Sequence, residues 1–249
     1  MSPAAAVALA ETRRQPGLRL ADVALVDIPA SKDRLEPLAK EMSERYGVKV
    51  VPLYCDVSDE EQVKALKDDL IRELGTVDFA HINAGVCLMG DDVDVPYSTW
   101  KKVIDIDLNG AFMTAQVAQQ IMREHNHGGS IIMTSSLSGY NANFIGGGPS
   151  PVCAYGTAKA GISQLARYMG AGLAPYGIRV NTISPGYIWS GIHEGVMDKA
   201  GHDMCLEVVP IKRFGRTDEL QGVMLFLASE ASSYITGINI PVDGGYSIF

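Results

Sequence analysis

Apolar runs rich in Val and Ile alternate with amphipathic stretches along most of the chain. The apolar runs predict strands at residues 21–28, 48–57, 77–85, 129–136, 178–186 and 237–245. The amphipathic stretches predict helices at residues 31–47, 59–75, 96–124, 152–174 and 217–229. Strands that lack a strict alternation of apolar and polar residues are buried on both faces, as in a parallel sheet covered by helices. The pattern therefore predicts an α/β fold with a doubly wound, Rossmann-like parallel sheet.

The sequence shows no boundary between domains. At 249 residues it is long enough for one large α/β domain, and no linker, internal repeat or low-complexity segment interrupts the pattern. We therefore expect a single domain over residues 1–249. The first residues, SPAAAVALAETRRQPG, lack the basic start of a signal peptide and are therefore interpreted as part of the fold. Their alanine-rich pattern predicts a helix.

Composition argues against several classes of function. The formal net charge of −8 argues against nucleic acid as a partner, because contact with phosphates needs a basic face. No apolar run approaches the length of a membrane span, so no membrane partner is expected. The four cysteines have no paired spacing, which predicts reduced thiols, no metal site and a cytoplasmic location.

A tyrosine and a lysine stand four positions apart near the start of the helix predicted at 152–174. Residues with this spacing share one face of a helix, so Tyr155 and Lys159 would be neighbours. A nearby ammonium favours the phenolate and can bring the pKa of a tyrosine down towards neutrality. Such a pair can serve as a general acid and base, although an ordinary surface pair has the same spacing.

Small or polar residues follow the carboxyl ends of five predicted strands, where a doubly wound sheet binds its ligands. They are Asp27, Asp56, Asn83, Ala84, Gly85, Ser136, Pro185 and Gly186. Asp27 has the place of a carboxylate that accepts both ribose hydroxyls of an adenine dinucleotide, or else serves as a turn or cap residue. Asp56 is either part of the same site or the cap of the following helix.

From residue 21 onwards the chain resembles the short-chain dehydrogenase/reductase family. The resemblance rests on Ser136, on Y-x-x-x-K at Tyr155, on NAG (83–85) and RVNTISPG (179–186), and on the carboxyl-terminal stretch from PIKRFG to PVDGG, all in family order. It implies an NAD(P)-dependent oxidoreductase that interconverts a secondary alcohol and a ketone. Members that act on polyols or sugars are the most similar.

The resemblance also implies catalytic roles. Tyr155 would be the acid and base, Lys159 would lower its pKa and bind the nicotinamide ribose, and Ser136 would hydrogen-bond the substrate oxygen. The fourth catalytic position usually holds asparagine, in a pattern like N-L-x-x-x-F. The sequence DIDLNGAF places Asp107 there, with Asn109 as the alternative.

The same resemblance implies a set of cofactor-binding residues. The set is Asp27, Asp56, Val57, Asn83, Ala84, Gly85, Tyr155, Lys159, Pro185, Gly186, Ile188 and Ser190. NAD is expected rather than NADP, because the Asp27 carboxylate would repel a 2′-phosphate. Arg34 is near enough in sequence to weaken that preference.

One family motif is missing from the sequence. The family begins with a central strand and a T-G-x-x-x-G-x-G loop that holds the pyrophosphate, and no such motif occurs here. We therefore expect the strand at 21–28 to lie beside the strand at 77–85, and we expect weak dinucleotide binding. The alternative to an enzyme is a cofactor-deficient relative that acts as a regulator or assembly partner.

The stretch after Ser136 is expected to line the pocket of a small-molecule alcohol or ketone, through Tyr140, Asn141, Asn143 and Phe144. The glycines at 146–148 are read as a flexible loop of this pocket, and residues 187–208 as a mobile lid. The carboxyl-terminal helix and strand carry more apolar surface than a monomer normally exposes, and in the family this region builds oligomers. The expected assembly is a homo-oligomer, either a dimer or a tetramer.

Overall fold

The structure is a computed structural model that describes residues 7–12, 21–88, 94–145, 148–149, 152–190 and 199–248. Its strands are β1 (Val7–Thr12), β2 (Ala21–Asp27), β3 (Val50–Tyr54), β4 (Phe79–Ile82), β5 (Gly129–Thr134), β6 (Phe144–Ile145), β7 (Gly148–Pro149), β8 (Ile178–Pro185), β9 (Ile188–Trp189), β10 (Gly215–Arg216) and β11 (Asn239–Val242). Its α-helices are α1 (Lys32–Tyr46), α2 (Glu60–Leu74), α3 (Tyr97–Val103), α4 (Gly110–His125), α5 (Cys153–Leu173), α6 (Lys199–Val208) and α7 (Gln221–Ala228).

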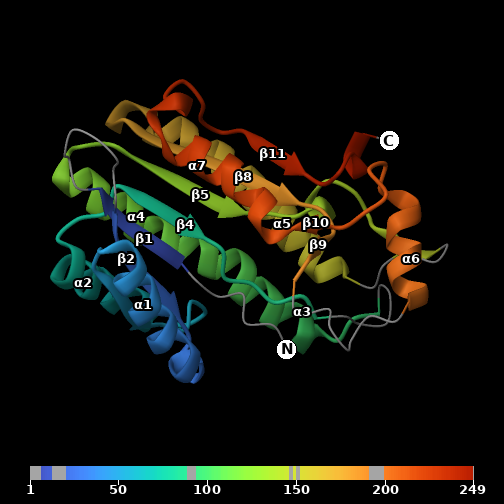
Figure 1. The fold of residues 1–249 in the computed structure, drawn as a ribbon, viewed down its shortest axis with the longest axis horizontal. Coiled ribbons are helices and arrows are strands. Elements are labelled where there is room, and N and C mark those ends of the chain that lie inside the picture. Colours follow the sequence, from blue (N-terminus) through green and yellow to red (C-terminus); the bar gives the residue numbers. More distant parts are fainter. Residues whose placement is uncertain are drawn as a thin grey trace.

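Seven strands form one sheet in the order β11-β8-β5-β4-β1-β2-β3 (Figure 1). The pairs β2–β3, β4–β5, β5–β8 and β8–β11 are parallel. The interior strand β1, next to the central strand β4, is antiparallel to both of its neighbours. The predicted doubly wound α/β fold is therefore confirmed, with one reversed strand in its interior.

The reversed strand overturns two expectations about the amino terminus. Residues 7–12 form a strand rather than part of a helix, and β2 does not lie beside β4, because β1 pairs with both. An open gap would leave the backbone groups of β2 and β4 unpaired in the interior, at about 1–3 kcal/mol for each group. Sheet pairing therefore outweighs the helix propensity of the alanines.

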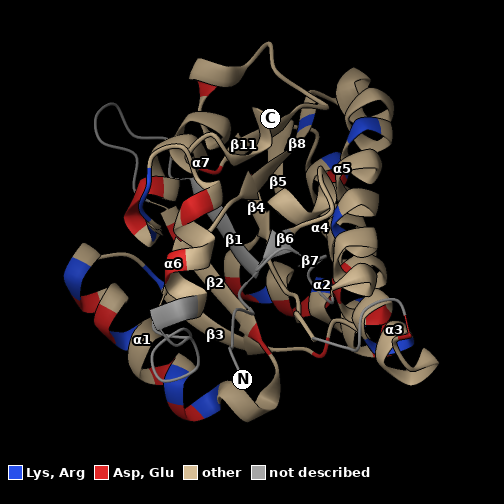
Figure 2. Ribbon diagram, turned by 90° about the vertical axis from the view of Figure 1, so that its right-hand side faces the viewer, with Lys and Arg blue, Asp and Glu red and all other residues tan. Residues whose placement is uncertain are grey.

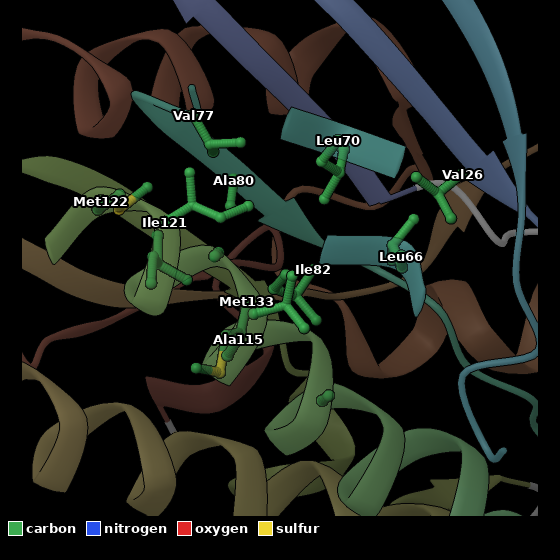
Figure 3. Packing of buried hydrophobic residues seen from close by; sticks show 14 of the residues in the cluster. Val26, Leu66, Leu70, Val77, Ala80, Ile82, Ala115, Ile121, Met122 and Met133 are labelled. Carbon is green, nitrogen blue, oxygen red and sulfur yellow. The ribbon is translucent and has the colours of Figure 1, made fainter. Parts of the chain in front are cut away.

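Helices cover both faces of the sheet. On one face α2, α4 and α5 bury the largest apolar cluster, which includes Leu66, Leu70, Ile121 and Met122 (Figure 3). On the other face α1 packs over β2, and α7 packs over β5 and β8. These layers leave the carboxyl ends of the parallel strands as the edge where polar residues gather.

Local signals explain where several helices begin and end. Asp59 caps α2, because its Oδ1 accepts the backbone N–H groups of Glu61 and Gln62 at 3.0 and 3.1 Å. Helix α1 ends at Gly47, whose φ of 65° is a left-handed conformation that favours glycine. The coloured ribbon shows that charged residues lie mainly on the helices and that few lie on the strands (Figure 2). No helix of the described residues is long and apolar enough to cross a membrane.

Three predicted segments differ from the expectation. The helix expected at 96–124 is two helices, α3 and α4, joined by a π-helical segment at Ile104–Asn109. The expected lid at 187–208 contains β9 and α6, and residues 191–198 lie outside the described part of the chain. In the expected glycine loop, Gly148 belongs to the β6–β7 hairpin, whereas residues 146–147 are not among those described.

Candidate active site

Tyr155 and Lys159 lie near the start of α5, beside the carboxyl end of β5. The Lys159 Nζ is 5.3 Å from the centre of the Tyr155 ring and donates to the backbone oxygen of Thr134 at 3.2 Å. The Lys159 side chain is only 3% exposed. A buried ammonium needs a counter-charge or several acceptors, because its desolvation costs free energy.

The counter-charge is Asp107. Its Oδ2 lies 3.3 Å from the Lys159 Nζ, and its Oδ1 accepts the backbone N–H of Val86 at 2.7 Å. The Asp107 side chain is fully buried, and this burial raises its pKa against the opposing effects of Lys159 and Val86. Gly85 makes this arrangement possible, since a Cβ there would lie 2.7 Å from the Asp107 Oδ2.

The π-helical segment contains both candidates for the fourth catalytic position, Asp107 and Asn109, and directs their side chains to different places. It carries Asp107 into the interior beside Lys159, whereas Asn109 donates to the Oδ1 of Asp105 at 3.1 Å in an exposed contact. π-Helical turns inside helices occur often at functional sites, where they change the direction of a side chain. The geometry therefore favours Asp107 and not the alternative Asn109.

Ser136 reaches the site through a short turn packed on α5. It follows β5 and accepts the backbone N–H of Ser138 at 3.1 Å. The turn Leu137–Gly139 lies directly on the helix backbone, because a Cβ at Gly139 would be 2.8 Å from the carbonyl carbon of Lys159. A Cβ at Gly156 would be 2.9 Å from the backbone oxygen of Ser138. Two glycines thus set the distance between the Ser136 turn and the Tyr155 helix.

The pKa of Tyr155 is raised, contrary to the expectation that Lys159 brings it down. Burial is the largest cause, and the negative charge of Asp107 adds to it. The positive charge of Lys159 and a hydrogen bond with Ser136 oppose this increase without overcoming it. The phenol of Tyr155 is therefore protonated at neutral pH, and the lysine moderates the effect of burial.

Asp27, at the end of β2, is paired with Arg34. Its side chain is 1% exposed, its Oδ1 accepts the N–H of Ile28 at 2.7 Å, and its Oδ2 lies 2.6 Å from the Arg34 Nη2. The Arg34 side chain is 44% exposed. A carboxylate and a half-exposed guanidinium thus occupy the place expected to meet the adenine ribose.

Asp56 is not the cap of α2, because Asp59 has that role. The Oδ1 of Asp56 accepts from the N–H and the hydroxyl of Ser58, at 2.9 and 2.6 Å. Val57 is buried and packs against Gly110, where a Cβ would lie 2.7 Å from a Val57 methyl carbon. These two residues form the turn after β3, at the site edge of the sheet.

Three further expected residues lie at the end of β4. Asn83 and Gly85 are half-buried and Ala84 is buried, and the segment leads directly to Val86, which binds Asp107. The structure thus brings this motif together with the acid and base pair.

The end of β8 supplies the last group of expected residues. Pro185 closes the strand, and Gly186 donates to the backbone oxygen of Val242 at 3.0 Å. A Cβ at Gly186 would lie 2.6 Å from the Cα of Asp243, so only glycine fits this approach. Ile188 lies in β9 and Ser190 follows that strand, and both are half-buried.

The pocket residues expected after Ser136 divide into two groups. Asn143 donates to the Ser138 hydroxyl at 2.6 Å, which connects it to Ser136 through one intervening side chain. The Tyr140 hydroxyl instead donates to the backbone oxygen of Asn239 at 3.0 Å. Asn141 is half-buried, and the Phe144 side chain lies outside the described part of the structure.

Sequence reasoning missed three contributors to the site. Thr134 supplies a carbonyl to Lys159, Ser138 connects Asn143 to Ser136, and Cys87 lies close enough to Tyr155 to act on its pKa. Cys87 remains partly exposed, and desolvation raises the pKa of its thiol. Only the position of Cys87, two residues after the NAG motif, gave a signal in the sequence.

Comparison with known proteins agrees with this geometry. A family model described as enoyl-(acyl carrier protein) reductase matches residues 5–247. The sorbose reductase of Candida albicans is 40% identical over 211 residues, which are 84% of this chain and 73% of that protein. The NADP-dependent mannitol dehydrogenase of Alternaria alternata is 39% identical over 216 residues, which are 86% of this chain and 77% of that one.

Solved structures give the same result. A short-chain type dehydrogenase/reductase from Mycobacterium marinum superposes with a TM-score of 0.83 at 38% identity, covering 91% of this chain and 85% of that one. NAD+-bound xylitol dehydrogenase superposes with a TM-score of 0.80 at 34% identity, covering 89% of this chain and 88% of that one. The chain therefore belongs to the short-chain dehydrogenase/reductase family of oxidoreductases.

Proposed function

We propose that this chain interconverts a secondary alcohol and its ketone with a nicotinamide dinucleotide, and that its substrate is a polyol or a sugar. The observation that carries the proposal is the buried Lys159, whose ammonium pairs with Asp107 and lies close to the Tyr155 ring, beside the Ser136 turn. The substrate class is supported by relatives that include a sorbose reductase, mannitol dehydrogenases and an L-rhamnose 1-dehydrogenase.

Three side chains have different roles in the transfer of the proton. When bound, the dinucleotide supplies or accepts the hydride. The Tyr155 hydroxyl donates a proton to the carbonyl oxygen during reduction and removes the hydroxyl proton during oxidation. Ser136 binds the same oxygen, and Lys159 stabilises the negative charge that forms on the Tyr155 oxygen.

The residues proposed to hold the dinucleotide fit its two ends. Asp27 can accept the adenine ribose hydroxyls, and the small residues Ala84 and Gly85 let the backbone after β4 approach a flat group. The remaining members of this set are Asp56, Val57, Asn83, Ala84, Tyr155, Lys159, Pro185, Gly186, Ile188 and Ser190. The pyrophosphate in the middle of the cofactor has fewer proposed contacts. Strand β1 ends at Thr12, which pairs with Ala21 at the amino end of β2, whereas the site lies at the carboxyl ends of the parallel strands.

Because β1 ends at Thr12, beside the first residue of β2 and away from the site, we expect the pyrophosphate to be held weakly. NADH fluorescence titration of the purified chain should give a Kd above about 1 μM. Binding much tighter than this would contradict the assignment of the amino-terminal segment. The same titration with a Lys159→Ala variant should weaken binding further, because the ammonium would be lost from the nicotinamide ribose.

The proposed cofactor is NAD(H) rather than NADP(H). The Asp27 carboxylate would repel a 2′-phosphate, and Arg34 offsets part of this repulsion because it is already paired with Asp27. We expect kcat/KM to favour NAD(H) by about tenfold. The Asp27→Ala variant should lose this preference, whereas the Arg34→Ala variant should strengthen it. Equal use of both cofactors by the unaltered chain would contradict the role of Asp27.

Turnover with mannitol, xylitol and sorbose tests the central assignment. The Tyr155→Phe variant should lose nearly all activity while it retains the fold and its affinity for NADH, because only the acidic hydroxyl is removed. Tyr168→Phe is a matched control, since that tyrosine lies on the same helix and is exposed. If Tyr155→Phe keeps a tenth of the activity, Tyr155 is not the acid and base.

We also propose that the chain forms a homo-oligomer through α7 and β11. Leu225 is 70% exposed, and Phe226 and Ile238 nearby in this region are also exposed. Apolar side chains gathered on one face favour association with a second copy.

A further inference from the structure

The buried ion pair between Asp107 and Lys159 has a consequence for the chemistry of Tyr155. At the position of Asp107 the family pattern usually has asparagine, which carries no charge. In this structure the Asp107 Oδ2 lies 3.3 Å from the Lys159 Nζ, and both side chains are buried. Among the described residues, Oδ2 has no hydrogen-bond partner apart from this ion pair.

The surroundings keep the ion pair in place. The Oδ1 of Asp107 is fixed by the N–H of Val86 at 2.7 Å, and the Lys159 Nζ is fixed by the Thr134 carbonyl at 3.2 Å. Gly85 lies against both charges, because a Cβ there would be 2.7 Å from Oδ2 and 3.1 Å from Nζ. The carboxylate and the ammonium are thus held together by backbone groups from two different strand ends.

The groups that act on Tyr155 come from four elements of the described structure. They are Lys159 on α5, Asp107 on the π-helical segment, Cys87 after β4 and Ser136 after β5. Cys87 is a neutral thiol near pH 7, because its pKa is raised, and Ser136 is uncharged. Lys159 and Asp107 therefore supply the only full charges in this set, and the carboxylate of Asp107 offsets part of the larger effect of the Lys159 ammonium.

We propose that Asp107 is the counterion of Lys159 and acts through it as a positioning residue, so that Tyr155 stays protonated at neutral pH and is ready to donate its proton to a ketone. This inference rests on the proposed function of Tyr155. In the reducing direction the carbonyl carbon would receive a hydride from the reduced dinucleotide, the carbonyl oxygen would take the proton from Tyr155, and the phenolate would regain a proton from the solvent.

The opposite direction needs the phenolate, so alcohol oxidation should require a higher pH than it would with asparagine at this position. Removing the carboxylate charge leaves the Lys159 ammonium uncompensated, and an uncompensated cation favours the phenolate. The direction of the effect is therefore fixed: the Asp107→Asn variant should have a lower pKa at Tyr155. The equilibrium constant of the overall reaction does not change, because only the pH range of each direction moves.

Ultraviolet titration of tyrosinate tests this inference without cofactor or substrate. The difference between the chain and its Tyr155→Phe variant isolates one of the ten tyrosines. The same difference is measured in the Asp107→Asn background, from about pH 8 to the highest pH at which circular dichroism shows an intact fold. We expect the midpoint to fall by about one pH unit, which is a tenfold change in the ionisation constant. Equal midpoints, or a rise, would overturn the proposal.

A second readout is the pH profile of kcat/KM for alcohol oxidation, whose rise should move to lower pH in Asp107→Asn by the same amount. Asp105→Asn is the matched control, because Asp105 lies on the same segment and pairs with Lys101 at the surface.

If no polyol is turned over by the unaltered chain, the proposed function fails while the tyrosinate titration still tests the ion pair. If Asp107→Asn does not fold, Asp107→Ser removes the same charge, and unfolding of both variants would assign Asp107 a purely structural role and overturn the proposal.

Discussion

Single atoms decide how the site residues can be arranged. Gly85 has no Cβ, and the space that a Cβ would fill is taken by the Asp107 carboxylate and the Lys159 ammonium. His81 lies on β4, and its Nε2 contacts the hydroxyl of Thr134 at 2.8 Å. The backbone oxygen of the same threonine accepts a hydrogen bond from Lys159. Both residues therefore act on the surroundings of Lys159, one through excluded volume and one through Thr134.

The Gly85→Ala variant should lose at least about tenfold in kcat/KM, because the new methyl group must push apart a buried ion pair. Kinetic assays with a polyol and NAD+ measure this loss. Gly172→Ala is the control, since a Cβ at Gly172 has no neighbour within 4 Å. That control should gain about 0.5–1 kcal/mol in stability, because alanine favours a helix interior. Wild-type kinetics in Gly85→Ala would show that the ion pair tolerates displacement.

The pKa of His81 is lowered from 6.5 to about 4, because burial disfavours its charged form. The unfolded chain therefore binds a proton between these values while the folded chain does not. The stability that comes from this difference is complete above the unfolded pKa and is lost as the pH falls towards 4. Lowering the pH from 7.5 to 5 should cost about 2 kcal/mol of unfolding free energy through this residue.

Urea unfolding at the two pH values measures this cost. In His81→Gln the pH dependence should be smaller by that amount, since glutamine can still contact Thr134 and does not titrate. The His125→Gln variant serves as the comparison, because His125 is exposed at the end of α4. An unchanged pH dependence in His81→Gln would mean that His81 is charged in the folded protein.

At the scale of elements, the site depends on how closely a short turn can approach a helix. The turn Leu137–Gly139 carries Ser136, and α5 carries Tyr155 and Lys159. Gly139 and Gly156 are the contact points, and a Cβ on either would lie within 3 Å of the other backbone. The spacing between Ser136 and Tyr155 is therefore a property of this packing.

The Gly139→Ala variant should lower kcat more than it raises KM, because the turn must move away from α5 and the serine would no longer reach the reacting oxygen. Circular dichroism should show an intact fold. Gly222→Ala on α7 has open space around the added methyl and should leave kcat unchanged. Equal loss of kcat in both variants would show that the effect does not come from this contact.

The sequence pattern predicted most elements because it depends on burial, which is a local and periodic property. It failed for residues 7–12, where alanine favours a helix but two strand edges favour pairing. It placed Tyr155, Lys159 and Ser136 at one edge and assigned Asp107 to the fourth position, but it left Asn109 open as the alternative. That distinction depends on the π-helical segment, which no periodicity signals. It also misjudged the direction of the Tyr155 pKa, since burial can be measured only in the folded chain.

At the scale of the whole molecule, the region of α7 and β11 carries the exposed apolar residues Leu225, Phe226 and Ile238. Strand β11 is an edge strand, and edge strands and apolar faces are typical places of association. The assembly proposed above therefore places this side in an interface between copies of the chain.

The Leu225→Lys variant should reduce the molar mass measured by light scattering at micromolar concentration, because a charge would have to be buried in the interface. Leu38→Lys is the control, since Leu38 is a half-exposed leucine on the charged helix α1. A monomer in the unaltered chain would contradict the proposed assembly.

The antiparallel direction of β1 also affects the order in which the sheet can assemble. β1 and β2 are connected by residues 13–20 alone, so their pairing needs only a short loop to close. The pairing of β1 with β4 joins segments separated by α1, β3 and α2, and contacts of such long separation form slowly. We expect the β1–β2–β3 half of the sheet to gain protection from hydrogen exchange early in refolding, and the join between β1 and β4 to form last. The middle of the finished sheet is then the place where two independently growing halves meet.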